Sequence, residues 1–242
     1  MESAIVARGL EKSFRGAPAV MGVDLRVEGG ERVALLGANG AGKTTTLMML
    51  LGVITPDAGT IEMLGHLLPH ERSTAMLGVG FAAGYLPLPD KLKVRELLGV
   101  YGRLYGLPDP DDAGDRALRR FGISPLATQM ASELSSGQRT LVGLAKATMH
   151  HPRLLVLDEP TASLDPDVAL RARAGIESLC EADGTALLVT SHNMTEVERI
   201  CHRVVFLSHG KVVADGTAAD VAAQFGRPSL EDVFLHLASE EL

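Results

Sequence analysis

Cysteine is scarce in this chain, and long runs of basic residues are absent. Only two of the 242 residues are cysteines, Cys180 and Cys201, and they form no C-x-x-C pair. This scarcity argues against a disulfide framework or a zinc site and fits a reducing compartment. The net charge is -7, and lysine and arginine are dispersed. The chain therefore lacks the basic surface that a nucleic-acid-binding protein needs.

No segment has the pattern of a membrane-spanning or secretory sequence. The longest uncharged run, residues 73–89, is interrupted by three glycines and two prolines, whereas a spanning helix needs about 20 consecutive apolar residues. The amino terminus, MESAIVARGLEK, has no long apolar core and does not resemble a signal peptide. We therefore expect a cytoplasmic protein, and any membrane component of its function would come from another chain.

The chain does contain the alternating strand and helix patterns of an α/β domain. Alternating apolar residues over 4–14 and 22–37 predict antiparallel strands that meet at a turn over residues 28–30. The second of these segments leads into a glycine-rich loop and a helix predicted over residues 42–51.

Further along, continuous apolar runs over residues 152–160 and 185–192 predict buried parallel strands, with a helix between them from about 167 to 181. Residues 204–216 predict a hairpin that turns at His209 and Gly210.

Helical periodicity replaces the strand pattern in the middle of the chain. Apolar residues recur every three or four positions over 94–107 and 111–123. We predict an α/β fold with a mostly parallel core sheet, an antiparallel β-rich amino-terminal portion and a helical insert. The expected boundaries are a core over about 1–86 and 140–226, a helical subdomain over about 87–139 and a terminal helix over about 229–239.

The segment GANGAGKT, residues 37–44, matches G-x-x-x-x-G-K-[ST] and lies between an apolar strand and a helix. Its glycines allow the backbone N–H groups to point inward, and the helix adds the positive end of its dipole. We predict that Lys43 reaches the β- and γ-phosphates of a nucleotide and that the Thr44 hydroxyl binds Mg²⁺. The alternative is a glycine-rich turn with a surface lysine. The nucleotide-binding residues predicted here are Gly37, Asn39, Gly40, Ala41, Gly42, Lys43, Thr44 and Thr45.

Two acidic residues and a histidine follow predicted buried strands. Asp158 ends the strand LLVLD, where ligands meet open α/β sheets, and could hold Mg²⁺ through water. Glu159 could deprotonate an attacking water, although a solvated loop carboxylate would have the same pattern. His192 follows the next strand and could bond a γ-phosphate, or it could be an ordinary surface histidine.

A second predicted helix start lies at ELSSGQR, residues 133–139. Serine hydroxyls and free N–H groups at this helix end could bind an anion, and Gly137 keeps the backbone accessible. An ordinary serine cap explains the same residues.

The order of these motifs resembles the nucleotide-binding domain of ATP-binding cassette (ABC) transporters over nearly the whole chain. It comprises the glycine loop, LSSGQ at residues 134–138, LLVLDEPTASLD at 154–165, and His192. The resemblance implies that two such domains pair, each ATP being held between the glycine loop of one and the LSSGQ helix of the other. It also implies roles for further residues. Phe14 would stack on adenine; Ser135, Gly137 and Gln138 would contact the nucleotide of the second subunit; Asp165 would cross between subunits; Glu159 would be the general base and His192 the switch histidine.

The resemblance further implies an ATP-hydrolysing subunit that uses ATP and Mg²⁺. The terminal stretch SLEDVFLHL resembles the separately encoded ATPases of ABC-2-type exporters. The expected partners are a second ATPase subunit, as a homodimer, and integral membrane permease subunits on whose cytoplasmic face the chain would sit; nucleic acid is not expected. One alternative is a soluble ABC ATPase that remodels a nucleoprotein, and another is a small-molecule kinase, which would not explain LSSGQ.

Three departures from the family pattern stand out. Ala82, Ala83 and Gly84 occupy the places where the family carries a glutamine that touches Mg²⁺. A water or a main-chain oxygen would have to substitute, or ATP sensing is weaker. Ser136 stands where glycine is commonest, and Leu141 stands where a basic residue often follows the motif. Because Thr44 and Asp158 remain, we expect hydrolysis to be retained.

Overall fold

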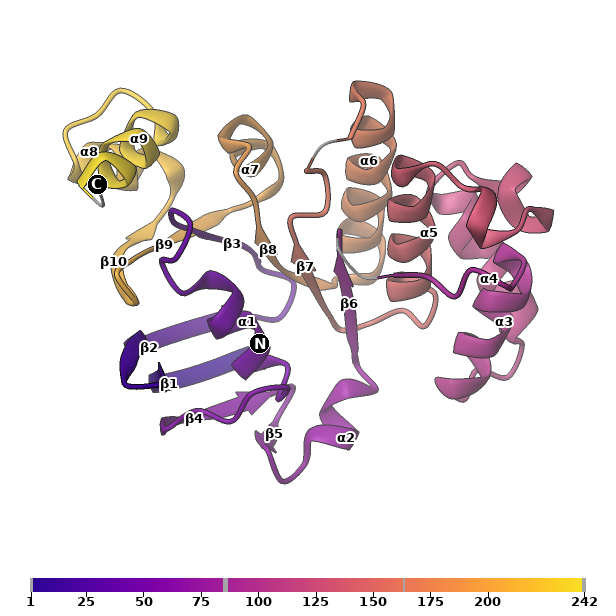
Figure 1. Ribbon diagram of the computed structural model, residues 1–242, viewed down its shortest axis with the longest axis horizontal. Coiled ribbons are helices and arrows are strands. Elements are labelled where there is room, and N and C mark those ends of the chain that lie inside the picture. The colour runs from indigo at the N-terminus through magenta and orange to yellow at the C-terminus, as the bar shows by residue number, and fades with distance from the viewer. Residues whose placement is uncertain (1, 85–86, 163, 241–242) are drawn as a thin grey trace. The chain divides into compact units, whose positions relative to one another are not determined.

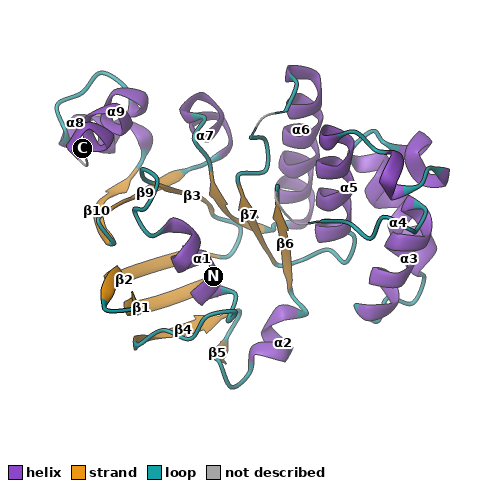
Figure 2. Cartoon of the chain, viewed as in Figure 1, coloured by secondary structure: helices purple, strands orange, loops and turns teal. Residues whose placement is uncertain are grey.

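The computed structural model describes residues 2–84, 87–162 and 164–240, and the chain forms two compact units. Unit 1 combines residues 1–76 and 186–242, and unit 2 consists of residues 77–185. Figure 1 follows the chain from its N-terminus to its C-terminus, and Figure 2 distinguishes its helices from its strands. The predicted subdomain boundary near residue 86 falls on residues 85–86, outside the described residues, and the predicted boundaries stay predictions.

An antiparallel sheet forms the amino-terminal part of unit 1, with its strands in the order β2-β1-β4-β5. These strands are β1 (Ser3–Phe14), β2 (Ala17–Glu28), β4 (Ala58–Met63) and β5 (His66–Leu68). β1 pairs with β2 through a tight turn at Arg15 and Gly16, both at positive φ. The predicted hairpin turn over residues 28–30 was therefore wrong, because that turn leads from β2 into a strand of a different sheet.

A second set of strands in unit 1 surrounds β3 (Arg32–Leu36). β3 lies between two parallel neighbours, β8 (Ala186–Thr190) and β9 (Arg203–Ser208), and β10 (Lys211–Gly216) closes the set by pairing antiparallel with β9. All residues of β8 are buried, which explains its continuous apolar sequence. The predicted buried strand and the predicted hairpin are confirmed.

Five helices belong to the described part of unit 1. They are α1 (Lys43–Leu50), α2 (Arg72–Met76), α7 (Met194–Ile200), α8 (Ala218–Gln224) and α9 (Leu230–Glu240). The predicted terminal helix is therefore confirmed as α9, which buries Leu230, Val233 and Leu237 along one face. α8 packs against both α9 and β10.

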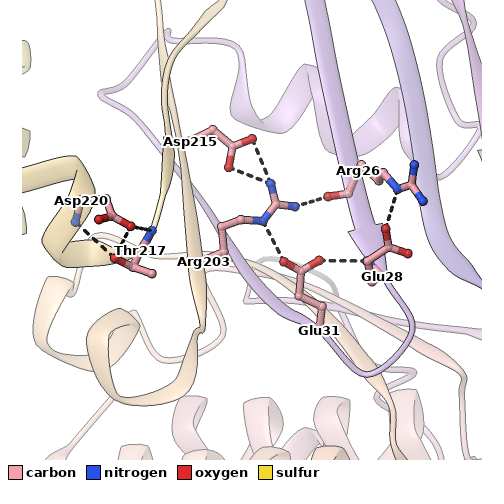
Figure 3. Close-up of polar contacts among 7 residues, drawn as sticks. All are labelled: Arg26, Glu28, Glu31, Arg203, Asp215, Thr217 and Asp220. Carbon is pink, nitrogen blue, oxygen red and sulfur yellow. Dashed lines mark hydrogen bonds and ion pairs between the residues drawn. The ribbon is translucent and has the colours of Figure 1, made fainter. Parts of the chain in front are cut away.

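An ion network around Arg203 joins four segments of unit 1 (Figure 3). Its guanidinium donates to Glu31 at 2.7 Å, to Asp215 at 2.7 and 2.9 Å, and to the carbonyl oxygen of Arg26. Burial opposes the charge of Arg203, but the bonds to Glu31 and Asp215 outweigh burial and raise its pKa. The network therefore ties β9 and β10 to β2 and to the turn that leads into β3.

Unit 2 packs helices against one parallel strand pair, β6 (Val79–Ala83) and β7 (Leu154–Asp158). Its helices are α3 (Val94–Leu104), α4 (Pro110–Arg120), α5 (Ser136–Thr148) and α6 (Pro166–Asp183), with 3₁₀ turns η1 (Ser124–Thr128) and η2 (Ala131–Glu133). Figure 1 shows α5 and α6 side by side, and they are in contact. The helical insert, the strand at β7 and the helix after it were all predicted correctly.

Candidate functional site

The phosphate loop lies between β3 and α1 in unit 1, as the sequence predicts. Gly42 caps α1 in the left-handed conformation, with φ of 101°, and as a glycine it has no side chain with which to cap the helix. A Cβ at Gly42 would lie 2.6 Å from the carbonyl oxygen of Ala19, so only glycine fits there. The result is a helix start whose N–H donors have no side-chain cap, which is the arrangement that binds phosphate.

Lys43 lies within this loop rather than extending into solvent. Its side chain is 8% exposed, and its ammonium donates to the carbonyl oxygens of Gly37 at 2.7 Å and Ala38 at 3.0 Å. The hydroxyl-bearing Thr44 that follows is exposed at the start of α1, and Thr45 is half-buried. The loop therefore gathers a cation, an exposed hydroxyl and helix N–H groups in one place. The tip of the loop, at Asn39 and Gly40, is also exposed.

The turn between β9 and β10 supports the loop, which the sequence did not indicate. Gly210 donates to the carbonyl oxygen of Ala41 at 3.1 Å and accepts from the N–H of Met21 at 2.8 Å. A Cβ at Gly210 would lie 2.8 Å from the Ala19 carbonyl oxygen, and one at Gly37 would collide with the Leu207 carbonyl oxygen. Gly210 thus links the phosphate loop to β2. In the sequence, Gly210 is recognisable only as the glycine of a predicted hairpin turn. A turn glycine does not indicate which other segment the turn contacts.

The residue predicted to stack on adenine, Phe14, ends β1 with 45% of its surface exposed. The ammonium of Lys12 lies 5.9 Å from its ring centroid, and that lysine also bonds Asp57 at 2.6 Å. An exposed aromatic face beside a fixed cation can stack on a base.

His192 lies directly after β8 in unit 1, also as predicted, and it is exposed. The adjacent backbone is held by side chains on both sides. The N–H of Asn193 donates to the Ser191 hydroxyl at 3.0 Å, and the Asn193 side chain accepts from the N–H of Glu196 at 3.1 Å. The ring of Phe234, from α9, meets the His192 ring edge-on, with centroids 5.7 Å apart.

The acidic pair lies in unit 2, at the end of β7. Asp158 is buried and Glu159 is half-buried. Glu159 has φ of 51°, an uncommon conformation for a residue with a side chain. Such strain costs roughly 1–3 kcal/mol and gathers at functional positions. The backbone therefore turns sharply at the residue predicted to be the general base.

The second helix start, at α5, is closed by its own side chains. The Ser135 hydroxyl accepts from the N–H of Gln138 at 3.3 Å, and the Gln138 side chain accepts from the N–H of Ser135 at 2.9 Å. This reciprocal pair is a capping box. Both the predicted anion site and the alternative serine cap therefore use the same residue, Ser135, which is exposed.

Gly137 and Asp165 complete the predicted residues of unit 2. A Cβ at Gly137 would lie 3.2 Å from a methyl of Val168 in α6, so the glycine permits close packing of the two helices. Asp165 is the exposed N-cap residue of α6, and its side chain makes no cap bond.

The three small residues at the end of β6 lie beside the acidic pair. Ala83 pairs with Asp158, and the N–H of Gly84 donates to the Asp158 carbonyl oxygen at 3.4 Å. A Cβ at Gly84 would meet only the Glu159 carbonyl oxygen, at 3.5 Å, so a side chain has room there. A cleft of about 530 Å³ borders these residues and includes Glu159 in its lining. Leu141, where a basic residue was expected, is 1% exposed and belongs to the core face of α5.

The predicted residues thus fall into two groups, one in each unit. Unit 1 brings together the phosphate loop with Gly210 and, separately, His192 with Phe234. Unit 2 brings Asp158 and Glu159 to the end of the strand pair β6 and β7, and it holds the Ser135 helix start. No helix in the described ranges 2–84, 87–162 and 164–240 combines the length and hydrophobicity that crossing a membrane requires.

Comparison with known proteins gives consistent matches. A family model described as ABC transporter matches residues 20–162. The chain is 37% identical over 240 residues to the Nod factor export ATP-binding protein I of Paraburkholderia xenovorans, covering 95% of this chain and 76% of that protein. It is 33% identical over 241 residues to the daunorubicin resistance ATP-binding protein DrrA3 of Streptomyces coeruleorubidus, covering 99% and 76%.

Solved structures agree with these matches. An ATP-binding subunit of an ABC transporter superposes with a TM-score of 0.88 at 28% identity, covering 97% of this chain and 99% of that one. A dimeric ATP-binding cassette bound to ADP and Pi superposes with a TM-score of 0.81 at 20% identity, covering 88% and 98%, which is a likeness of fold.

Proposed function

Because this chain belongs to the ABC transporter family, we propose that it is the ATP-hydrolysing subunit of an exporter whose membrane-embedded subunits are separate chains. The observation that carries the proposal is the start of α1. There a left-handed Gly42, which has no side chain to cap the helix, lies beside the buried Lys43. This arrangement fits a triphosphate, since a Cβ would fill the cradle at Gly42.

In binding a triphosphate, Lys43 would exchange its bonds to the carbonyl oxygens of Gly37 and Ala38 for bonds to the β- and γ-phosphates. The exchange is favourable because a charged phosphate oxygen is a stronger acceptor than a neutral carbonyl. Phe14 would stack on the base from its exposed position at the end of β1.

The residues present also fit Mg²⁺, which prefers oxygen ligands. The Thr44 hydroxyl and the Asp158 carboxylate would hold the ion, with water taking further places. When bound, Mg²⁺ neutralises part of the phosphate charge and so favours attack at the γ-phosphorus. Because Ala82, Ala83 and Gly84 carry no side-chain oxygen or nitrogen, water or main-chain oxygens would fill the ligand place that a glutamine takes in the family.

Hydrolysis would run through Glu159. Its carboxylate would accept the proton as water adds to the γ-phosphorus, while the bond from that phosphorus to the β–γ bridging oxygen breaks. ADP and inorganic phosphate would leave, and Glu159 would return its proton to solvent. His192 would bond the γ-phosphate oxygens, whose negative charge a donated hydrogen bond stabilises.

A second copy of the chain would complete each site. Ser135, Gly137 and Gln138 would contact the nucleotide held by the partner's phosphate loop, and Asp165 would lie at the junction of the two copies. The support is that Ser135 is exposed at a helix start and that the exposed Asp165 carboxylate makes no cap bond in α6. Closure and reopening of this pair would drive the membrane subunits.

The direction of transport follows from the relatives, whose names describe export of Nod factor and resistance to daunorubicin. We therefore place this chain at the cytoplasmic face of a membrane, held there by its permease partners. The cargo would be selected by those partners.

The test is Glu159→Gln. With Mg-ATP this variant should elute as a stable dimer in sizing chromatography, and its hydrolysis should fall by about 100-fold or more, because the general base is lost while binding is kept. Glu62→Gln is the matched control, since Glu62 is exposed in β4 and lies outside the predicted site. A persistent monomer that hydrolyses ATP normally would contradict the mechanism.

A further inference from the structure

The ring of His192 is not oriented by burial. The residues on both sides of it are fixed by hydrogen bonds of 3.0 and 3.1 Å, but its own side chain is exposed. An exposed side chain samples several rotamers unless a neighbour selects one. One such neighbour of the His192 ring is the ring of Phe234, from α9.

Phe234 meets His192 at an interplanar angle of 79°, with ring centroids 5.7 Å apart. This edge-to-face arrangement is one of the two that aromatic rings prefer. The contact joins the loop after β8 to α9.

Phe234 is itself held in place. Its ring lies 6.2 Å from the ring of Phe206, which is fully buried in β9. Its helix is anchored by Leu230, Val233 and Leu237, all of which are at most 5% exposed. At the start of α9, the Ser229 hydroxyl donates to the Asp232 carboxylate at 2.5 Å and accepts from the N–H of Asp232 at 3.2 Å. The well-anchored ring of Phe234 therefore contacts the exposed ring of His192.

We propose that Phe234 is a positioning residue for His192, selecting the side-chain orientation in which the histidine meets the γ-phosphate. This inference rests on the proposed function of His192 in ATP hydrolysis. It makes the rate of hydrolysis depend on the docking of α9.

A second aromatic pair, which also involves α9, supplies a matched control. Phe225, at the end of α8, meets His236 of α9 with centroids 6.3 Å apart and an interplanar angle of 70°. The chemistry and the helix are the same, but His192 is not involved. Phe225→Leu thus reproduces the loss of a ring that packs on α9 without touching the switch histidine.

The experiment compares Phe234→Leu with Phe225→Leu in steady-state ATP hydrolysis. Phe234→Leu should lower kcat by roughly two- to tenfold, the range that an aromatic pair can supply, and leave the KM for ATP unchanged. Phe225→Leu should leave kcat and KM unchanged, while it shifts Tm about as much as Phe234→Leu does. Phe234→Met, which fills the space with a flexible apolar side chain, is the second variant if the leucine protein is unstable.

An NMR readout separates positioning from general structural loss. The ring-proton signals of His192, assigned by comparison with His192→Gln, carry the ring-current shift of Phe234 in the wild-type protein. They should move in Phe234→Leu and stay in place in Phe225→Leu.

Equal kcat in the two leucine variants would overturn the inference, as would unmoved His192 signals in Phe234→Leu. A wild-type protein that hydrolyses no ATP, with His192 signals that still respond to Phe234→Leu, would instead overturn the proposed function. Loss of kcat with unchanged KM and moved His192 signals supports both.

Discussion

The two helix starts at α1 and α5 solve the same physical problem in opposite ways. α1 begins at Gly42, a left-handed residue with no side-chain cap, whereas α5 begins at Ser135 inside a complete capping box. In α1 the N-cap residue offers no side chain to the first N–H groups, whereas in α5 the N–H groups of Ser135 and Gln138 already have side-chain partners.

A ligand at α1 would meet a site that is already formed, whereas a ligand at α5 would require the capping side chains to rearrange. Phosphate meets α1 without breaking any side-chain cap. To use the N–H of Gln138, an anion at α5 would have to displace the Ser135 hydroxyl, so we expect the proposed second site to be the weaker one until another copy of the chain supplies the nucleotide. The arrangement favours binding first and pairing second.

The largest effect should come from Gly42→Ala. The substitution combines a φ of 101° with a Cβ 2.6 Å from the Ala19 carbonyl oxygen, so the loop has to shift. A hydrogen bond to a charged group contributes about 1.5–3 kcal/mol, so misaligning the loop N–H donors should lower ATP affinity by roughly 10- to 100-fold, measured by isothermal titration calorimetry.

Gly226→Ala is the control for this substitution, because Gly226 has φ of 62° but no atom lies within 4 Å of the place that its Cβ would take. It should cost stability through backbone strain alone and leave ATP affinity intact. Equal losses of affinity in the two variants would show that close packing at Gly42 is irrelevant.

Ser135→Ala should have the next largest effect and should act on the second helix start. Loss of the cap should lower the free energy of unfolding by about 1 kcal/mol. Hydrolysis should fall further, by roughly tenfold, because a hydrogen bond to a charged phosphate is lost as well. ATP binding to isolated monomers should be unchanged, as measured by calorimetry at low protein concentration.

Thr217→Ala removes the cap of α8, where the Thr217 hydroxyl accepts from the N–H of Asp220 at 3.2 Å. It should lower stability by a similar amount and spare hydrolysis. A Ser135→Ala protein with wild-type turnover would mean that the capping box of α5 is structural only.

Acid should weaken unit 2 through His150, which follows the far end of α5. Its ring stacks on Tyr105 with centroids 3.9 Å apart, and burial lowers its pKa from 6.5 to about 4. The unfolded chain therefore binds a proton below pH 6.5 that the folded chain binds only near pH 4. Stability is thus lost as the pH falls through this window.

Urea unfolding at about pH 7.5 and about pH 5 measures this loss, and His150→Asn should reduce it. The sequence has no tryptophan and three tyrosines, all between residues 77 and 185, so tyrosine fluorescence reports on unit 2. His70→Asn, at an exposed position, should keep the wild-type dependence. If His150→Asn loses as much stability between the two pH values as the wild type does, His150 is not the source of the loss.

The smallest effect should follow Gly84→Gln. A side chain at this position meets only the Glu159 carbonyl oxygen at 3.5 Å, and the backbone there is not left-handed. We expect an unchanged Tm and a change of less than about fivefold in turnover, since one solvent-exposed hydrogen bond contributes about 1 kcal/mol. A large drop in Tm would show that β6 requires the glycine.

Much of the fold could be predicted because its signals are local. The helix at α1 follows the glycine-rich loop, β7 and β8 are continuous apolar runs, β9 and β10 flank a glycine turn, and α9 has the apolar period of a helix docked by one face. β4 was missed because only Ile61 and Met63 are buried among its six residues. β6 was missed because a glycine and two alanines leave it little apolar pattern.

The family and the resemblance to exporter ATPases are confirmed, whereas the roles of the site residues stay predictions. The two helix starts could be located from residue spacing, since Gly42 and Ser135 each lie beside their own helix. The difference in capping between the two helix starts could not be predicted, because Ser135 followed by Gln138 fits either a cap or a ligand site.

The sequence by itself determined where we predict phosphate to bind, because the glycines, Lys43 and Thr44 lie next to one another in the chain and depend only on local backbone conformation. Tertiary structure alone decided which distant residues support the phosphate loop and His192. Gly210 reaches Ala41, and Phe234 reaches His192, only after separate strands and a terminal helix have packed together. Contacts between residues so distant in the chain depend on which elements pack against one another, and the apolar pattern of an element does not specify its packing partner.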